Sequence, residues 1–282
     1  MFELSGVVHR IEQEKALDQF SEPVAKWVSQ VTKPDAIKYA LSGSWLGHQL
    51  HPMASDIPLG AWLMASVLDV TGGPTMRPAA RRLVGLGVLS AIPAAASGAS
   101  DWAESYGKQQ RVGYVHALAN GTGTILQACS WLARRKDRHR TGTLLSLAGL
   151  GMTLGAAYLG GHLSFTKGVG VNHTAFQRSV NTWTDVAADD DVTEGQLLRV
   201  TAKNVPVVLA RNEGHLHALS ATCSHAGGPL DQGRIEDGCI VCPWHQSKFK
   251  LNDGAPARGP AGSAQPVWQV KTEDGRVLIR SA

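Results

Sequence analysis

Cysteine is scarce in this chain, and its few cysteines predict no disulfide framework. Four of them occur in 282 residues, which excludes the small secreted domains that depend on several bridges. Strong charge of one sign is also missing, because 27 basic residues offset 23 acidic ones and leave a formal charge of +4. That balance is too mild to indicate nucleic acid as a partner. The length is sufficient for two or more domains.

Charged side chains are lacking altogether from four segments between residues 43 and 166. These segments are Ile57–Leu68, Leu83–Ser100, Val112–Ala133 and Thr141–Thr166. A helix of about 20 residues spans the hydrocarbon core of a membrane, and a soluble bundle would keep Lys and Glu on its outer faces. Small residues are common in these segments, as they are where membrane helices pack closely. We therefore expect four transmembrane helices, which form a membrane domain over residues 46–166.

Basic residues in two of the connections bear on the orientation of this bundle. They are Arg77, Arg81 and Arg82 in the first connection, and Arg134, Arg135, Lys136, Arg138 and Arg140 in the third. The positive-inside rule places both connections in the cytoplasm and both termini together on the outside of the bacterial cell membrane. No secretory or twin-arginine signal opens the chain, however. The termini are expected on one side, and which side stays open.

The residues before the membrane domain form an expected N-terminal segment, residues 1–45. Phe20, Val24, Val28 and Val31 recur there at helical spacing, and this pattern predicts an amphipathic helix. Its apolar face is expected to pack on a neighbouring domain or to lie at a membrane surface.

Two short motifs in the last third of the chain carry metal-binding chemistry. Cys223 and His225 form a Cys-x-His pair, and Cys242 and His245 form a Cys-x-x-His pair further on. Thiolate and imidazole are ligands for transition metals, and two of each would complete a tetrahedral zinc site. The short first spacing and the Gly- and Pro-rich flanks, with no helix to carry the second pair, favour a different metal group.

The whole motif resembles the Rieske [2Fe–2S] domain, from about Thr182 to Arg280. The resemblance rests on Cys-x-His, a spacer of this size, Cys-x-x-His, and a Gly-x-Pro-Leu turn behind the first pair. It implies that Cys223 and Cys242 hold one iron and that His225 and His245 hold the other. Neutral imidazoles in place of two thiolates make such a cluster easier to reduce.

The resemblance also implies an all-β domain over residues 182–282, joined to the membrane domain by a linker over residues 167–181. Short apolar runs separated by turn residues agree with a barrel-like arrangement of strands. These runs are Leu197–Val200, Val205–Ala210, Leu216–Leu219, Ile240–Val241 and Val277–Ile279. The expected fold is thus multidomain, with an α-helical four-helix transmembrane bundle followed by an all-β Rieske domain.

Residues around the ligand loops are expected to tune the cluster. Respiratory Rieske proteins carry a disulfide at the positions that match Gly228 and Trp244 here, so this domain is similar to the ferredoxin type. Ser247 matches a serine that bonds a bridging sulfide, Phe249 stands where those relatives carry a tyrosine, and Gln246 replaces a usual glycine. A Gly-Pro stretch further on resembles the loop that covers the cluster from a third side. The residues expected around the cluster are Gly228, Pro229, Ser247, Phe249 and Pro260.

The membrane domain contains ionisable residues of its own. It resembles an uncharacterised bacterial family of four-helix membrane domains, through His-Pro-Met at residues 51–53 and Gly-Gly-His-Leu at residues 160–163; this resemblance implies no activity. Ionisable groups at membrane depth usually face an interior. Three interpretations stay open: the groups satisfy one another, they form a haem or quinone site, or they hold a non-haem metal. The candidate residues are His51, Asp56, His116 and His162.

These features predict a membrane-anchored Rieske iron–sulfur protein that transfers one electron at a time. The expected partners are membrane lipid and a protein or quinone that donates or accepts the electron. The alternatives are a catalytic oxidoreductase, acting as a membrane oxygenase or a quinol oxidoreductase, and a redox or iron sensor. A soluble-type Rieske oxygenase is disfavoured, because the 37 residues after His245 contain no further histidine for a mononuclear iron.

Overall fold

The computed structural model describes residues 4–282, which divide into two compact units. The helical unit comprises Met1–Thr32 and Leu50–Val169. The strand unit comprises Lys33–Gln49 and Gly170–Ala282. The expected segment 1–45 is therefore divided between the two units, and most of the expected linker belongs to the strand unit.

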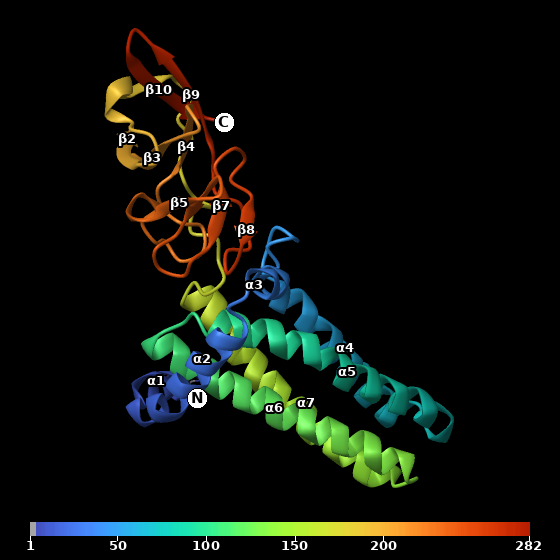
Figure 1. The fold of residues 1–282 in the computed structure, drawn as a ribbon. Coiled ribbons are helices and arrows are strands. Elements are labelled where there is room, and N and C mark those ends of the chain that lie inside the picture. Colours follow the sequence, from blue (N-terminus) through green and yellow to red (C-terminus); the bar gives the residue numbers. More distant parts are fainter. Residues whose placement is uncertain (1–3) are drawn as a thin grey trace. The chain divides into compact units, whose positions relative to one another are not determined.

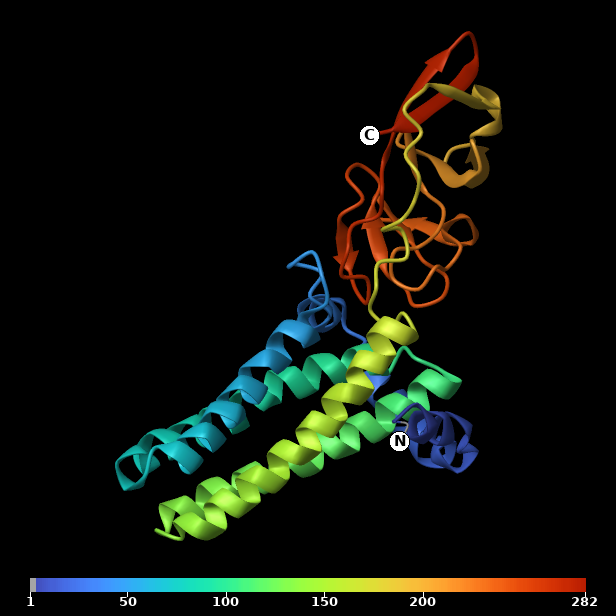
Figure 2. The same ribbon diagram turned by 180° about the vertical axis from the view of Figure 1, so that it is seen from behind.

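Two helical hairpins form most of the helical unit. Figures 1 and 2 show α4 running beside α5, and α6 beside α7. Two shorter helices, α1 and α2, lie against α6, and α2 also contacts α5. The helices are α1 (Leu4–Gln13), α2 (Asp18–Val31), α4 (Leu50–Thr71), α5 (Arg77–Trp102), α6 (Gly107–Arg135) and α7 (His139–Gly161), which continues as a π-helical turn over His162–Thr166.

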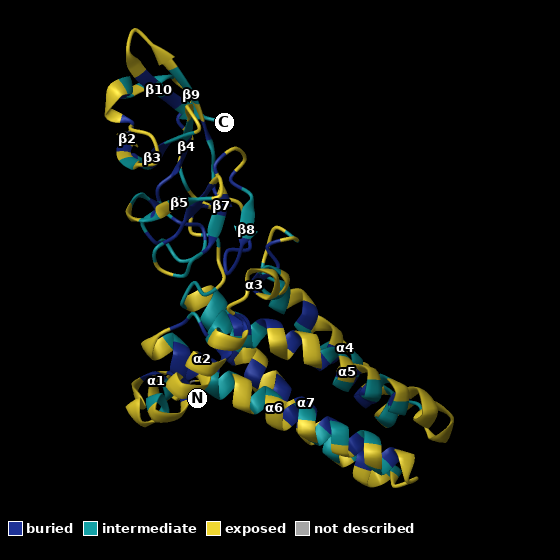
Figure 3. Ribbon diagram, viewed as in Figure 1, coloured by how far each residue is buried: buried dark blue, intermediate teal, exposed yellow. Residues whose placement is uncertain are grey.

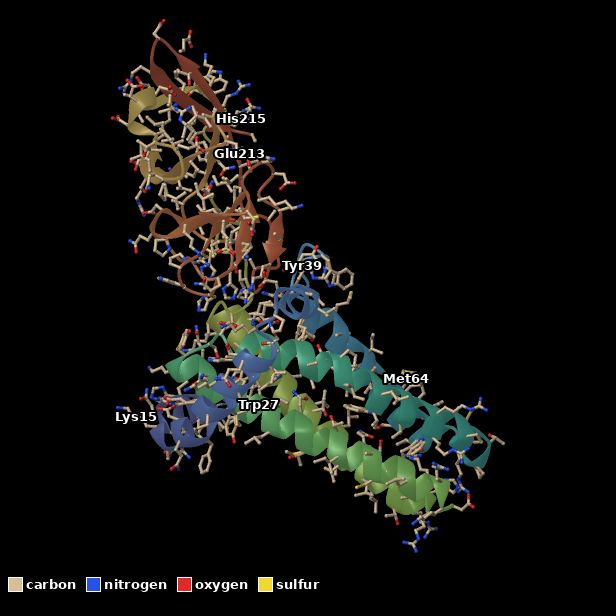
Figure 4. The ribbon with its side chains drawn as sticks, viewed as in Figure 1. Lys15, Trp27, Tyr39, Met64, Glu213 and His215 are labelled. Atoms are coloured by element: carbon tan, nitrogen blue, oxygen red, sulfur yellow. The ribbon has the colours of Figure 1, made fainter. Side chains whose placement is uncertain are left out.

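Three helices in the described part of the chain are long and apolar enough to cross a membrane: Leu50–Thr71, Pro74–Trp102 and His139–Thr166. Large apolar side chains predominate on the outward faces of these helices, as at Met64 on α4, which is exposed (Figure 4). Helix α6 is the exception among the four expected spans. Its polar side chains lower its mean hydropathy. Some of them are buried against α7, where Gln127 is fully buried and donates to the carbonyl of Ser146.

The two hairpins repeat the same set of contacts. In each, a histidine in the first half of the first helix donates from Nδ1 to a carbonyl of the second helix, and a side chain eleven residues later does the same. The pairs are His51 with Ala94 (2.8 Å), Trp62 with Val84 (3.3 Å), His116 with Ala156 (2.7 Å) and Gln127 with Ser146 (3.0 Å). A glycine, Gly98 or Gly160, lies against each histidine ring. The equal spacing indicates an internally repeated motif.

Three antiparallel sheets make up the strand unit. Their strand orders are β1–β10–β9, β2–β3–β4 and β5–β6–β7–β8. The strands are β1 (Thr184–Ala188), β2 (Leu197–Ala202), β3 (Val205–Asn212), β4 (His215–Ser220), β5 (Arg234–Glu236), β6 (Cys239–Val241), β7 (Lys248–Lys250), β8 (Pro256–Arg258), β9 (Trp268–Glu273) and β10 (Arg276–Ser281). The all-β prediction is confirmed.

Strand β3 lies between the two apolar cores of this unit. Its Val207 and Leu209 face a core shared with β9 and β10, whereas Val208 and Ala210 face a core shared with the small β5–β8 sheet. Burial on both faces explains why this strand is an almost continuous apolar run rather than an alternating one. Figure 3 shows the resulting buried centre.

The turn between β3 and β4 lies at Glu213 and Gly214, both in the left-handed backbone region. Such a two-residue turn matches the twist of a hairpin. Figure 4 shows Glu213 and His215 at this turn.

One helix belongs to the strand unit. Helix α3 (Asp35–Ser42) begins after Pro34 and ends at Gly43, whose left-handed backbone terminates the helix. It packs against β8.

Candidate metal centre

The two ligand loops have the same backbone design. In each, the cysteine N–H donates to the carbonyl five residues later, and the cysteine carbonyl accepts from the N–H four residues later. The bonded pairs are Cys223 with Gly228 and Gly227, and Cys242 with Ser247 and Gln246, at distances between 2.8 and 3.0 Å. The second loop leads from β6 into β7. Equivalent turns thus present equivalent side chains toward one another.

Both loops require a left-handed residue at the same position. Gly227 (φ 77°) fills it in the first loop, and Gln246 (φ 60°) fills it in the second. A glutamine adopts this backbone at a cost. Its side chain is held by Arg234, whose Nη1 donates to Oε1 at 3.0 Å. Replacement of the usual glycine therefore leaves the loop conformation intact.

The four predicted ligands meet as two pairs. The rings of His225 and His245 lie 4.9 Å apart between centroids and nearly perpendicular, and the thiols of Cys223 and Cys242 are hydrogen-bonded to each other. Within residues 4–282, no group of three His, Cys, Asp or Glu side chains converges as a site for one metal ion. A zinc site needs all four ligands around one point, whereas a [2Fe–2S] cluster takes two at each iron. The pairing fits the cluster.

Local electrostatics shift the pKa values of three of these side chains. The hydrogen bond from Cys223 lowers the pKa of Cys242 to about 7, with help from the N–H groups of Trp244 and His245. The same bond, and then burial, raises the pKa of Cys223. Burial, with the nearby charges of His245 and Lys38, lowers the pKa of His225 to about 3. The imidazole is therefore neutral at pH 7, as a metal ligand must be.

Two further features leave room for a metal group. Nδ1 of His225 is buried and has no hydrogen-bond partner among the described residues, although buried polar atoms are normally paired. At Gly228, a Cβ would lie 3.0 Å from Sγ of Cys242 and 3.1 Å from the ring of Trp244. The residues present thus fit a cluster. Gly228 also contacts Trp244, and these two residues match the disulfide positions of respiratory proteins.

The other residues expected around the cluster lie next to the ligand loops. Ser247 is fully buried, and its Oγ accepts from the N–H of Ala261 at 3.0 Å, which leaves its own hydrogen free to donate. Phe249 is buried in the core and has no hydroxyl to offer. Pro229 pairs with Thr222 at the end of the first loop. Pro260 follows a cis peptide bond in the loop that precedes Ala261.

The segment 33–49 contributes to the site, although no sequence motif indicates it. Asp35 of α3 accepts from Nε of Arg258 at 2.8 Å and pairs with Nζ of Lys248 at 3.3 Å. Arg258 also donates from Nη1 to the carbonyl of Gln246 at 2.9 Å. One guanidinium therefore ties the segment to the second ligand loop.

The same segment reaches the third loop. Ser44 donates to the carbonyl of Ala261 at 2.8 Å, and a Cβ at Gly259 would collide with Ser42. Lys38 is fully buried in this contact, and its charge acts on His225. No local pattern signals these roles, since a lysine on a short helix is normally solvated.

Gln265 holds the first ligand loop, a role that its sequence context did not reveal. Its amide accepts from the N–H of Ser224 at 3.0 Å and donates to the carbonyls of Ser220 and Thr222 at 2.6 and 2.7 Å. A fully buried amide with three such bonds fixes the loop.

The four candidate residues of the membrane domain do not form one cluster. His51 and His116 come together, with ring centroids 6.2 Å apart, and Nε2 of His116 lies 3.1 Å from the amide of Asn120. His162 instead contacts Glu12 at 3.2 Å, and Asp56 faces outward, exposed. The pKa of Glu12 is held below its usual range by hydrogen bonds, first from Lys167 and then from His162.

Comparison with known proteins identifies both parts of the chain. Residues 182–271 match the Rieske [2Fe-2S] domain family, and residues 47–173 match a family described as predicted membrane protein (DUF2231). The strand part is 33% identical to the anthranilate 1,2-dioxygenase ferredoxin subunit of Burkholderia cepacia over 97 residues, which are 34% of this chain and 90% of that protein. The chain belongs to the Rieske [2Fe–2S] family. Its cofactor is accordingly a [2Fe–2S] cluster, as the sequence predicted.

Other Rieske proteins are similar over the same part of the chain. A human Rieske domain-containing protein is 38% identical over 91 residues, which are 29% of this chain and 58% of that protein. The solved ferredoxin of carbazole 1,9a-dioxygenase from Nocardioides aromaticivorans IC177 is 26% identical, with a TM-score of 0.35, over 36% of this chain and all of that one.

Proposed function

We propose that the protein is a membrane-anchored Rieske electron carrier, in which Cys223 and Cys242 hold one iron and His225 and His245 hold the other. The observation that carries this proposal is the pairing of thiol with thiol and imidazole with imidazole across two equivalent loops. When bound, the cluster accepts and releases single electrons. The protein holds the cluster through these four side chains and controls which side of the cluster a redox partner can reach.

The cysteine sulfurs are prepared by the backbone. N–H groups of His225 and Ala226 bond Cys223, and those of Trp244 and His245 bond Cys242. Such donors stabilise negative charge on sulfur and favour the reduced state. Ser247 adds one more donor hydrogen in a fully buried position. Phe249 cannot add another, so we place the potential of the cluster between the ferredoxin and respiratory ranges.

Electrons reach the cluster on the side of His245. Its neighbour Trp244 is 55% exposed, with the two rings 6.3 Å apart between centroids. His225 faces the contacts made by segment 33–49 and the small polar cavity beside His48 and Gln49. The relatives named ferredoxin subunits or components of dioxygenases support a protein donor or acceptor at the exposed side.

The helical unit supplies the membrane anchor in this proposal. Three helices are sufficiently long and apolar, and α6 completes a four-helix span because its polar face is turned toward α7. An even number of spans places both termini on one side. His51 and His116 are the residues that we assign to a membrane redox site, where a quinone or a haem would exchange electrons with the carrier.

A spectrum and an iron analysis of the full chain purified in detergent test the proposal. We expect the absorption and the reduced-state EPR signal of a [2Fe–2S] cluster, with two irons per chain. Cys242→Ser should abolish both, whereas His217→Ala, a strand histidine outside the ligand loops, should retain them. A colourless wild type with stoichiometric zinc would contradict the carrier.

The same sample separates the carrier from the alternatives. A Soret band that is lost in His116→Ala would assign haem to the membrane site, and cluster reduction by quinol that slows in this variant would assign quinone. Oxygen uptake that depends on an organic substrate would overturn the carrier in favour of an oxygenase. Reduction without oxygen uptake supports it.

A further inference from the structure

A cavity of about 400 Å³ lies in the helical unit, at the end where each hairpin turns. Arg77 lines it from the first residue of α5, and His139 and Arg140 line it from the first two residues of α7. Figure 1 shows both helix starts at the same end of the unit. The two helices of the internal repeat thus contribute equivalent basic positions to one space.

The acidic residue in the wall does not cancel this positive charge. Asp69 is bound by both Nη atoms of Arg134, and the two side chains are almost completely buried together. By contrast, neither Arg77 nor Arg140 forms an ion pair within the part of the chain that the structure describes. The residues that line the cavity therefore carry a net positive charge, because Arg134 already neutralises the Asp69 carboxylate.

A polar atom in the wall has no partner. Nδ1 of His139 is buried without a hydrogen bond to any described residue, while its Nε2 lies 3.5 Å from Asp137. Because buried nitrogen atoms are normally paired, a polar group supplied from outside the chain would complete this site, and the doubly protonated ring would donate from Nδ1 to an anion there.

The helix ends add to the attraction for an anion. Neither α5 nor α7 has an acidic residue in its first turn or a side-chain cap. The positive ends of both helix dipoles consequently remain uncompensated, a condition that favours a bound anion.

We propose that this cavity binds the phosphate of an anionic phospholipid head group. Arginine suits phosphate because its planar fork donates two parallel hydrogen bonds. A lipid rather than free phosphate is favoured by the rest of the wall, in which Pro74 and Leu144 are apolar and Leu144 is 68% exposed on the outward face of α7. The site is separate from electron transfer, and its role is to hold the two hairpins together at their turning end.

Lipid titration of the full chain tests the proposal. Delipidated protein in a neutral detergent would be titrated with dioctanoyl phosphatidylglycerol, with dioctanoyl phosphatidylcholine and with inorganic phosphate. Binding would be followed by native mass spectrometry and by thermal unfolding at 222 nm. We expect phosphatidylglycerol to bind and to raise the unfolding temperature more than the other two. The Arg77→Gln/Arg140→Gln variant should bind it at least about tenfold more weakly, as expected for lost charge-assisted hydrogen bonds.

A matched variant separates the cavity from general surface charge. Arg82→Gln/Arg138→Gln removes the same charge close to the same two helix starts, at exposed positions that do not line the cavity, and should bind like wild type. Equal losses in both variants would overturn the site. Equal binding of the two lipids would also overturn it, and equal stabilisation by inorganic phosphate would overturn the lipid as its source. If the Gln variant does not fold, Arg77→Lys/Arg140→Lys takes its place, with a smaller loss expected because lysine keeps the charge without the fork.

Discussion

The strand unit and the helical unit satisfy buried polar groups by opposite means. In the strand unit, backbone N–H groups of two irregular loops remain free to bond cysteine sulfur. In the helical unit, the backbone N–H groups already bond carbonyls within their own helix. Side chains such as His51 and His116 instead donate a second hydrogen bond to backbone carbonyls of the neighbouring helix. Loops can therefore concentrate ligand chemistry at one place. Helices distribute polar contacts along their length and, here, repeat them in two hairpins.

The largest expected effect concerns the buried ion pair of the helical unit, Asp69 with Arg134. Asp69→Asn leaves Arg134 charged and unpaired in a buried position, so we expect a loss of about 3–5 kcal/mol in the free energy of unfolding. Guanidinium unfolding followed by circular dichroism measures it. The double replacement Asp69→Leu/Arg134→Met should recover most of the loss. If Asp69→Asn unfolds like wild type, the helical unit does not depend on this pair.

Lys38 tests how strongly the strand unit concentrates charge at the cluster. Lys38→Met removes a buried positive charge that acts on His225, so the reduced cluster should become less favourable. We expect the midpoint potential to fall by about 59 mV, a tenfold change for one electron, in a redox titration followed by EPR. Lys33→Met, at an exposed position in the same segment, is the control. A shift of the same size in both variants would show that the charge of Lys38 affects the midpoint potential no more than an exposed charge does.

Acid should release the segment 33–49 from the ligand loops. Burial raises the pKa of Asp35, but hydrogen bonds from Arg258 and Lys248 outweigh it and leave the pKa lowered. A lowered folded-state pKa contributes stability above the unfolded value of about 3.9, and this stability is lost as pH falls below that value.

Asp35→Asn is expected to remove this pH dependence. The carboxylate is largely exposed, so the cost at pH 7 should be only about 0.5–1 kcal/mol. Urea unfolding of the two proteins at pH 7 and pH 3 measures both quantities. A difference between them that is as large at pH 3 as at pH 7 would exclude Asp35 as the titrating group.

The smallest expected effect is at Gln246, where a side chain occupies a left-handed position. Gln246→Gly relieves the backbone but loses the bond to Arg234, so we expect a change within about 0.5 kcal/mol. Gln246→Ala loses the bond without relief and should be about 1 kcal/mol less stable than the glycine variant. Equal unfolding free energies for the Gly and Ala variants would show that backbone strain at this turn is unimportant.

Much of both units was predictable from local sequence. Cys-x-His and Cys-x-x-His indicated the Rieske family and its cluster, because metal chemistry constrains residue type at short range. Charge-free segments identified the four long helices, although α6 lacks the apolarity of a span. Position along a helix did not reveal which histidines would meet: His51 and His116 do so, but His162 turns to Glu12 and Asp56 faces outward.

The Cys/His motif, the strand pattern and the helix pattern could be read from the chain because each depends on residues that are neighbours in sequence. The attachment of α3 to the cluster loops could not, since Asp35 meets Arg258 across a separation of 223 residues. Nor could the burial of Lys38, because a lysine on a short helix is normally solvated. Folding alone brings such residues together, and the free energy that keeps them there comes from packing and paired charge that no local pattern records.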